Sequence, residues 1–401
     1  MRKHKSDRLI TILTFVLMAI GLIVIYAIGP QRANFINATA PPDEQMGTND
    51  FFFNQLRSVI LSTAAFIFAF KFPYEKLRTY AKWIMIIGLV ACAVLAIASV
   101  VSMPIAVCEM GGCRWINLGA TTFQPAELVK LGLVLYLAQL AAKCKKEGKL
   151  ESRDFLQPFV IVSVLALVFA VIFQKDLGTG AAMVAIILAM LFMSGIKISY
   201  FVVAVAVVLA GGLFAIFSSP HRLERMATFS GEGTSDENYH LDNAKMAIGT
   251  GGFLGVGIGN SVQATGYLPE SINDSVFAVM GETFGFVGLS AIVLVFYLLL
   301  MRLLKTSSHL ETEKSLVVAG VFAWVAAHVV VNIAAMTGLV PLTGITLPLL
   351  SYGGTSMIFV AFSLGLVSQL SCYTGREVRN EDISSRRGVG GTYYSSRRRS
   401  A

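Results

Sequence analysis

Charged side chains within or next to long apolar runs are the first candidates for chemistry, because charge in such surroundings is costly and often functional. Glu127 and Lys130 lie three residues apart at the start of one run. This spacing puts both on one helix face, where they can pair. Pro125 suits the first turn of that helix. The pair fits either a substrate site or a structural ion pair that lets both charges enter the protein interior.

Four further carboxylates lie where polar segments meet or enter apolar runs. Asp176 precedes one run, Glu270 and Asp274 precede another, and Glu282 follows eight residues after Asp274. We expect Glu282 to be buried. A carboxylate at such a boundary can act as a general base on a hydroxyl within hydrogen-bond reach. A helix cap is the alternative role for Asp176 and for Asp274.

Three segments of unusual composition lie near these acidic residues. Residues 249–260 are rich in glycine but hold neither a G-x-G-x-x-G pattern nor a P-loop lysine, so we expect a close-packed or re-entrant segment without nucleotide. Two prolines in 341–356 interrupt any continuous helix. Irregular backbone at membrane depth lines a cavity or is buried, so 341–356 is expected to shape a site. Residues 221–225 resemble an interfacial segment with two cations.

The composition is that of an all-α polytopic membrane protein. Of 401 residues, 55% are hydrophobic and 14% are charged, whereas soluble domains carry about 25% charged residues. The apolar runs are long enough to cross about 30 Å of hydrocarbon as helices, and the short alternating segments of a transmembrane barrel are absent. We predict ten spans, at residues 9–29, 53–71, 82–103, 126–142, 158–173, 178–194, 199–217, 275–301, 315–338 and 355–371.

The basic residues predict the orientation of these spans. Most of the 32 Lys and Arg fall at the two chain ends and in the connections on the same side as the ends. The positive-inside rule places that side, and both termini, in the cytoplasm. Topology therefore accounts for the net charge of +8, and no nucleic-acid-binding pattern is present. The first apolar run lacks a cleavage site and is interpreted as a retained span.

One transmembrane domain is expected over residues 1–371, with its large outer loop at 218–274, between spans seven and eight. Residues 372–401 form a basic cytoplasmic tail whose composition is typical of disorder. Cys108 and Cys113 share an outer loop, where a disulfide can form in an oxidising compartment. Two free thiols are the alternative. No Cys/His spacing typical of a zinc site is present.

Five blocks spread over nearly the whole chain match one family signature. They are residues 114–119, 124–130, 174–179, 267–282 and 332–356. On these blocks the chain resembles the SEDS family of bacterial cell-wall polymerases, the FtsW/RodA/SpoVE proteins. Residues 257–261 look more like the division member, FtsW, than the elongation member, RodA. Ser275, residues 283–284 and the Cys108 to Cys113 segment depart from the usual pattern.

The resemblance implies an inverting glycosyltransferase that polymerises lipid II at the outer face of the bacterial cytoplasmic membrane, with a role in cell division. The donor would be the growing glycan on undecaprenyl pyrophosphate, and the acceptor the GlcNAc 4-hydroxyl of lipid II. A single displacement needs one base, and the sequence offers no obvious second carboxylate as nucleophile. Asp274 is the expected base. The other candidate substrate-binding residues are Arg114, Lys130, Arg222, Lys245, Glu127, Glu270, Asp176 and Ser351.

Among these candidates, Arg114, Lys130, Arg222 and Lys245 are expected, in that order, to bind pyrophosphate. Glu127 would hold Lys130 or line the donor cavity. A divalent cation, Mg or Mn, is a candidate bridge at the pyrophosphate, although the sequence shows no ligand set for a metal. The resemblance also implies a class B penicillin-binding transpeptidase and divisome proteins as partners.

Two other functions fit the composition. A lipid II flippase or another transporter also needs broken helices and intramembrane charges, although no internal repeat relates the two halves. A non-catalytic divisome scaffold would use the basic tail for docking and would tolerate loss of Asp274.

Overall fold

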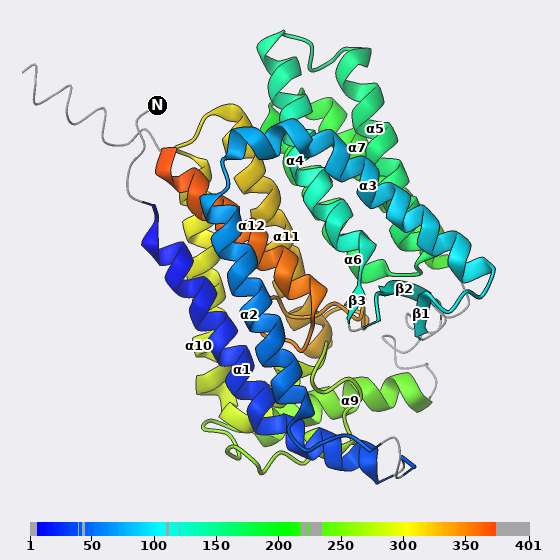
Figure 1. Cartoon of the computed structure of the whole chain (residues 1–401), viewed down its shortest axis with the longest axis vertical. Helices are drawn as coiled ribbons and strands as arrows, with labels where there is room; N and C mark the ends of the chain where they lie inside the picture. Colours follow the sequence, from blue (N-terminus) through cyan, green and yellow to red (C-terminus); the bar gives the residue numbers. More distant parts are fainter. Residues whose placement is uncertain are drawn as a thin grey trace, which may run out of the picture.

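Ten apolar runs of the sequence form helices long enough to cross a membrane, as expected where every backbone N–H and C=O needs a partner within its own element. In this computed structural model they form a helical bundle with a small sheet at one end (Figure 1). The ten-span prediction is confirmed, since each predicted run falls on one helix. The structure describes residues 6–38, 40–41, 45–109, 112–119, 121–217, 223 and 235–373.

The spanning helices follow one another along the chain. They are α1 (Arg8–Asn37), α2 (Asp50–Lys71), α3 (Tyr74–Val100), α4 (Pro125–Lys146), α5 (Arg153–Leu167) with a π-helical extension η1 (Val168–Phe173), α6 (Leu177–Ser194), α7 (Ile198–Phe217), α10 (Val276–Ser307), α11 (Thr312–Met336) and α12 (Thr355–Leu370) with a 3-10 turn η3 (Ser371–Tyr373). The fifth and sixth spans form a tight hairpin, because η1 and α6 are separated by three residues, Gln174 to Asp176.

The helices form two groups. Figure 1 shows α1, α2, α10, α11 and α12 together and α3 to α7 beside them. Helix α11 packs against α10 in its own group and against α4 and α6 in the other. The seam between the groups therefore runs along α11, and side chains on α4, α6 and α11 can meet there.

The part of the outer loop that the structure describes contains a short helix and a glycine-rich segment. Helix α9 (Ser235–Thr250) runs across the end of the bundle that also carries the sheet (Figure 1). The 249–260 segment then packs against a kink in α10 at Gly285, whose φ is +66°. A Cβ added to Gly255 would lie 2.2 Å from the carbonyl oxygen of Thr283. The glycines thus permit close backbone contact, as the close-packed alternative predicts.

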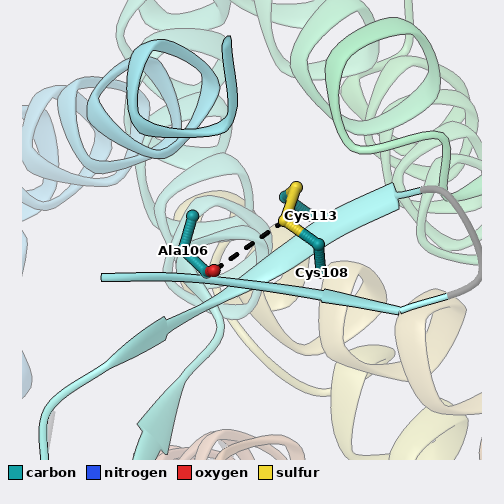
Figure 2. Close-up of a disulfide and its surroundings, with 3 residues drawn as sticks. All are labelled: Ala106, Cys108 and Cys113. Carbon is teal, nitrogen blue, oxygen red and sulfur yellow. Dashed lines mark hydrogen bonds between the residues drawn. A yellow bond between two sulfur atoms is a disulfide. The ribbon is translucent and has the colours of Figure 1, made fainter. Parts of the chain in front are cut away.

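A three-stranded antiparallel sheet lies between α3 and α4, where the sequence analysis expected only a loop. Its strands are β1 (Ala106–Glu109), β2 (Gly112–Asn117) and β3 (Thr122–Phe123), in the order β1-β2-β3. The strands are too short to give a strong alternating signal. Cys108 and Cys113 are cross-strand partners and form a disulfide (Figure 2), so the bridged alternative holds.

Candidate functional site

A cavity of about 530 Å³ lies at the end of the bundle that carries the sheet. All three strands, α4, α6, α11, the loop before α10 and the irregular segment before α12 contribute side chains to its wall. The sequence elements singled out for chemistry therefore converge on one place. Its charged lining residues are Arg32, Arg114, Glu127, Asp176, Glu270 and Asp274.

Asp274 lies in the cavity wall and is only 9% exposed. Ser275 occupies the N-cap position of α10, so the helix-cap alternative for Asp274 is wrong. The side-chain amide of Asn332 donates to the backbone carbonyls of Asp274 and of Ile345, both at 2.7 Å. One buried amide on α11 thus fixes the loop that carries Asp274 and the irregular segment that faces it.

A serine and a histidine extend the hydrogen bonding of Asp274. The Ser275 hydroxyl donates to Oδ1 of Asp274 over 3.5 Å, and Nε2 of His240 lies 2.7 Å from the same hydroxyl oxygen. His240 belongs to α9, so this contact links the outer helix to the cavity wall. Sequence reasoning noted that Ser275 departs from the family pattern but did not connect it with His240, which is 35 residues away.

Glu127 and Lys130 form the ion pair that their spacing predicts. Nζ of Lys130 donates to Oε1 of Glu127 at 2.8 Å, and the Lys130 side chain is fully buried. Nζ also lies 4.8 Å from the ring centroid of Trp324. Glu127 lines the cavity, and its Oε2 has no hydrogen-bond partner among the described residues. Lys130 is absent from the described cavity wall, so it acts on the cavity through Glu127.

His328 is a cavity-lining residue that sequence reasoning missed. Its Nε2 lies 3.2 Å from Nζ of Lys130, and its Nδ1 lies 3.3 Å from the carbonyl oxygen of Thr346. An ammonium has no acceptor, so the consistent tautomer donates from Nδ1 to Thr346 and accepts from Lys130 at Nε2. One sequence feature could have identified His328 as a site residue: it lies one helical turn before Asn332, on the same face of α11.

Arg114 and Asp176 also line the cavity. Nη2 of Arg114 donates to the carbonyl oxygen of Lys175 at 3.4 Å, and the buried Nε has no partner among the described residues. Asp176 is the N-cap of α6 and accepts from the backbone N–H and the hydroxyl of Thr179 at 2.9 and 2.7 Å. Its cap alternative therefore holds, and Asp176 also lines the cavity.

A second arginine, Arg32 on α1, lines the same cavity and was not a sequence candidate. Arg32 lies beyond the expected end of the first span. Basic residues are common next to the ends of spans, so its position in the sequence did not indicate a site. Glu270 also lines the cavity and accepts a hydrogen bond from the side-chain amide of Asn273.

Two expected substrate-binding residues, Lys245 and Ser351, do not line the cavity, and a third lies outside the described residues. Lys245 is exposed on α9, and its side chain passes close to Gly338 and not along the cavity wall. The Ser351 hydroxyl is buried and accepts from the backbone N–H of Leu347, which stabilises the turn before the cavity-lining residues 352–356. Arg222 falls outside the described residues, as does most of the basic tail.

Glu282 is 2% exposed, so its predicted burial is confirmed. Its carboxylate accepts from the hydroxyl of Ser261 and from the backbone N–H groups of Val262 and Gln263. Glu282 therefore anchors the outer loop and takes no part in the cavity. Within the described part of the chain, no group of three or more His, Cys, Asp or Glu side chains could hold a metal ion.

Comparison with known proteins agrees with this architecture. A family model described as cell cycle protein, covering FtsW, RodA and SpoVE, matches residues 7–376. The chain belongs to the FtsW/RodA/SpoVE family. Stage V sporulation protein E of Bacillus subtilis is 32% identical over 378 residues, which are 93% of this chain and 99% of that protein. A probable peptidoglycan glycosyltransferase FtsW of Escherichia coli O6:H1 is 32% identical over 380 residues, or 92% of this chain and 87% of that one.

Solved structures share the fold of this FtsW/RodA/SpoVE protein. The rod shape determining protein RodA of Thermus thermophilus superposes with a TM-score of 0.64 at 23% identity, covering 91% of this chain and 96% of that one. A chain from a peptidoglycan synthase complex that coordinates polymerization and crosslinking gives a TM-score of 0.71 at 22% identity, covering 91% and 97%. At these identities the likeness concerns the fold, and the family assignment rests on the sequence matches.

Proposed function

We propose that this protein is a peptidoglycan glycosyltransferase that polymerises lipid II. The observation that carries the proposal is the placement of Asp274, Arg114 and Glu127 on the walls of one cavity. Family membership supports it, because relatives of similar length are named for this activity.

The reaction requires few groups, and the cavity offers each of them. Asp274 takes the proton of the acceptor hydroxyl as that oxygen attacks the anomeric carbon of the donor. The bond from that carbon to undecaprenyl pyrophosphate breaks, and attack from the opposite face inverts the centre. Negative charge then grows on the pyrophosphate, where cations aimed at it lower the barrier. Among the described residues, Arg114 and Arg32 are the cations that line the cavity.

Glu127 is suited to orient a sugar of the substrate. One carboxylate oxygen is held by Lys130, while the other is buried without a partner among the described residues and can accept from a substrate hydroxyl. Lys130 is too buried to touch pyrophosphate directly. Its contribution is to hold the Glu127 carboxylate in place through the ion pair at 2.8 Å.

The charges of one helix support an assignment of the side on which the reaction occurs. Helix α4 begins beside the cavity at Glu127 and ends in Lys143, Lys145 and Lys146. Basic ends of spans face the cytoplasm, so we assign the cavity to the outer face of the cytoplasmic membrane and both termini to the inside. Lipid II displayed on that face is then the available substrate.

Three further features belong to the proposal. A class B penicillin-binding transpeptidase is the expected partner, in line with the synthase complex whose chain shares this fold, and divisome proteins are expected because we infer a role in division. Mg or Mn bridging the pyrophosphate would rely chiefly on substrate oxygens, because the described residues supply no protein cluster for it. Loss of polymerisation in EDTA, restored by added Mg or Mn, would support that cation.

The test is polymerisation of purified lipid II by the detergent-solubilised protein, with and without a cognate transpeptidase. Long glycan made by the wild type and lost in Asp274→Asn supports the proposal. Lipid II crossing liposome bilayers without polymer formation would instead identify a transporter. Neither activity, together with normal division in cells that carry Asp274→Asn, would identify a scaffold.

A further inference from the structure

The disulfide of the small sheet lies next to the cavity and is not explained by the reaction itself. Cys108 on β1 and Cys113 on β2 face each other across the hairpin, as Figure 2 shows. The Cys108 sulfur also lies 3.8 Å from the carbonyl oxygen of Ala106. The residue after Cys113 is Arg114, which lines the cavity. A covalent link therefore stands one residue from the cation expected to meet pyrophosphate.

The hairpin is short and packs against α3 and α4. Strands β1 and β2 have four and six residues, β3 only two, and the β1–β2 pairing is irregular between Val107 and Cys108. In β2 only Gly112 is buried. A single short hairpin is marginally stable by itself in water, so its order depends on these packing contacts and on the disulfide. A cross-strand disulfide limits the other conformations open to such a segment.

The hairpin also contacts the corner that carries Asp176. A Cβ added to Gly112 would lie 2.6 Å from the carbonyl oxygen of Gln174, so the two backbones touch. Arg114 donates to the carbonyl oxygen of Lys175, whose φ of +53° is unusual for a residue with a side chain. These contacts hold only if β2 keeps its position. Contacts of β2 therefore join Arg114 to the corner that carries Asp176.

We propose that the Cys108–Cys113 disulfide is a positioning element for Arg114, so that substrate binding at the pyrophosphate depends on the oxidised pair. The inference rests on the proposed glycosyltransferase function. Reduction by a dithiol converts the bridge to two thiols and the dithiol to its own disulfide, with two electrons and two protons transferred. The hairpin then loosens, Arg114 leaves its contact with Lys175, and the KM for lipid II rises while the base at Asp274 is untouched.

The experiment compares oxidised wild type, wild type reduced with dithiothreitol, and the double variant Cys108→Ser/Cys113→Ser, each in detergent with lipid II. Cys144→Ala is the control, because this buried thiol lies in α4, in the turn that also holds Lys143 and Lys145 and away from the cavity. We expect KM to rise about tenfold on reduction and in the double variant, with kcat within about twofold. Reoxidation with oxidised glutathione should restore the wild-type KM but leave the double variant unchanged.

A double-variant comparison with Arg114 distinguishes two roles of the disulfide: positioning of Arg114 and general stabilisation of the protein. Arg114→Gln should raise KM strongly in the oxidised protein but add little in the Cys108→Ser/Cys113→Ser background, since interacting residues are not additive. Full additivity, or an unchanged KM in folded double variant, overturns the inference. A fall in kcat alone would also overturn it.

A second readout does not depend on catalysis. Amide hydrogen exchange of residues 112–117 and 174–176 should quicken on reduction, while exchange in α11 stays constant. Binding of undecaprenyl pyrophosphate should weaken in parallel. If oxidised wild type makes no polymer at all, the proposed function fails, whereas the exchange result still tests the positioning role. Unchanged exchange in the hairpin and corner on reduction contradicts that role regardless of activity.

Discussion

Nζ of Lys130 lies 2.8 Å from Oε1 of Glu127 and 3.2 Å from Nε2 of His328, with the lysine side chain fully buried. Lys130 therefore contacts two cavity-lining residues, Glu127 and His328, but does not line the cavity itself. A charge buried in this way is retained only if its partners are ionised or accept hydrogen bonds. The arrangement makes Glu127 a fixed carboxylate and joins α4 to α11 beneath the proposed site.

Removing the lysine charge should therefore damage stability as well as activity. We expect Lys130→Met to lower the free energy of unfolding by about 3–5 kcal/mol, because Glu127 is left as an uncompensated buried charge. The double variant Glu127→Gln/Lys130→Met should recover most of this loss but not the activity. Denaturant unfolding in detergent measures the first effect, and lipid II polymerisation the second. Equal stability of Lys130→Met and wild type would show that the pair is not coupled.

Replacing the proposed base should abolish turnover but spare binding. For Asp274→Asn we expect kcat to fall about 10²–10⁴-fold, the usual contribution of general acid–base catalysis. Binding of lipid II should change little, because the amide has nearly the same shape. Asp242→Asn is a matched control, since Asp242 is an exposed carboxylate on α9. An Asp274→Asn protein that binds lipid II and polymerises at the wild-type rate would exclude this residue as the base.

Arg114 and Lys245 test whether pyrophosphate binds at the cavity wall. A hydrogen bond to a charged group contributes about 1.5–3 kcal/mol, so Arg114→Gln should raise the KM for lipid II roughly 10- to 100-fold. Lys245 lies outside the cavity wall, and Lys245→Gln should change KM less than about twofold. Initial rates over a range of lipid II concentrations provide both values. A larger effect at Lys245 than at Arg114 would mean that pyrophosphate binds along α9.

Ser275 should influence the rate of the chemical step. Its hydroxyl bridges Asp274 and His240, and Ser275→Ala removes the bridge without adding bulk. We expect kcat to fall about 3- to 10-fold with KM unchanged, since one neutral hydrogen bond contributes about 0.5–1.5 kcal/mol. Ser275→Thr keeps the hydroxyl and should retain most of the rate. If the threonine and alanine variants behave alike, the hydroxyl has no role.

The phenol of Tyr352, a cavity-lining group outside the spans, should remain protonated at neutral pH. Burial raises its pKa, with a smaller rise from Asp50 and opposing effects from Asn54 and Arg57. A raised folded-state pKa gives stability that is present below the unfolded value of about 10 and is lost as pH rises through the folded value. Thermal unfolding from pH 8 to 11 should show a smaller alkaline loss in Tyr352→Phe. An identical loss in both proteins would contradict this reading.

The sequence by itself determined the elements and the local pairs. The lengths of the apolar runs predicted ten helices, because within hydrocarbon the backbone N–H and C=O groups must form hydrogen bonds inside their own helix. The spacing of Glu127 and Lys130 fixed their pairing, and proline and glycine in 341–356 predicted irregular backbone beside a cavity. Each of these depends on neighbours within a few residues, which is the range over which helix periodicity carries information.

Only the tertiary structure decided which distant residues meet. His328 reaches Lys130 across 198 residues, and Asn332 joins Asp274 to the segment before α12. Lys245 and Arg114 were both sequence candidates for pyrophosphate binding, yet Lys245 is exposed on α9 and Arg114 lines the cavity. Likewise the disulfide required the two strands to be paired in one register. These outcomes depend on loop paths and helix packing. Both are determined by contacts summed over the whole chain, and no local sequence pattern encodes them.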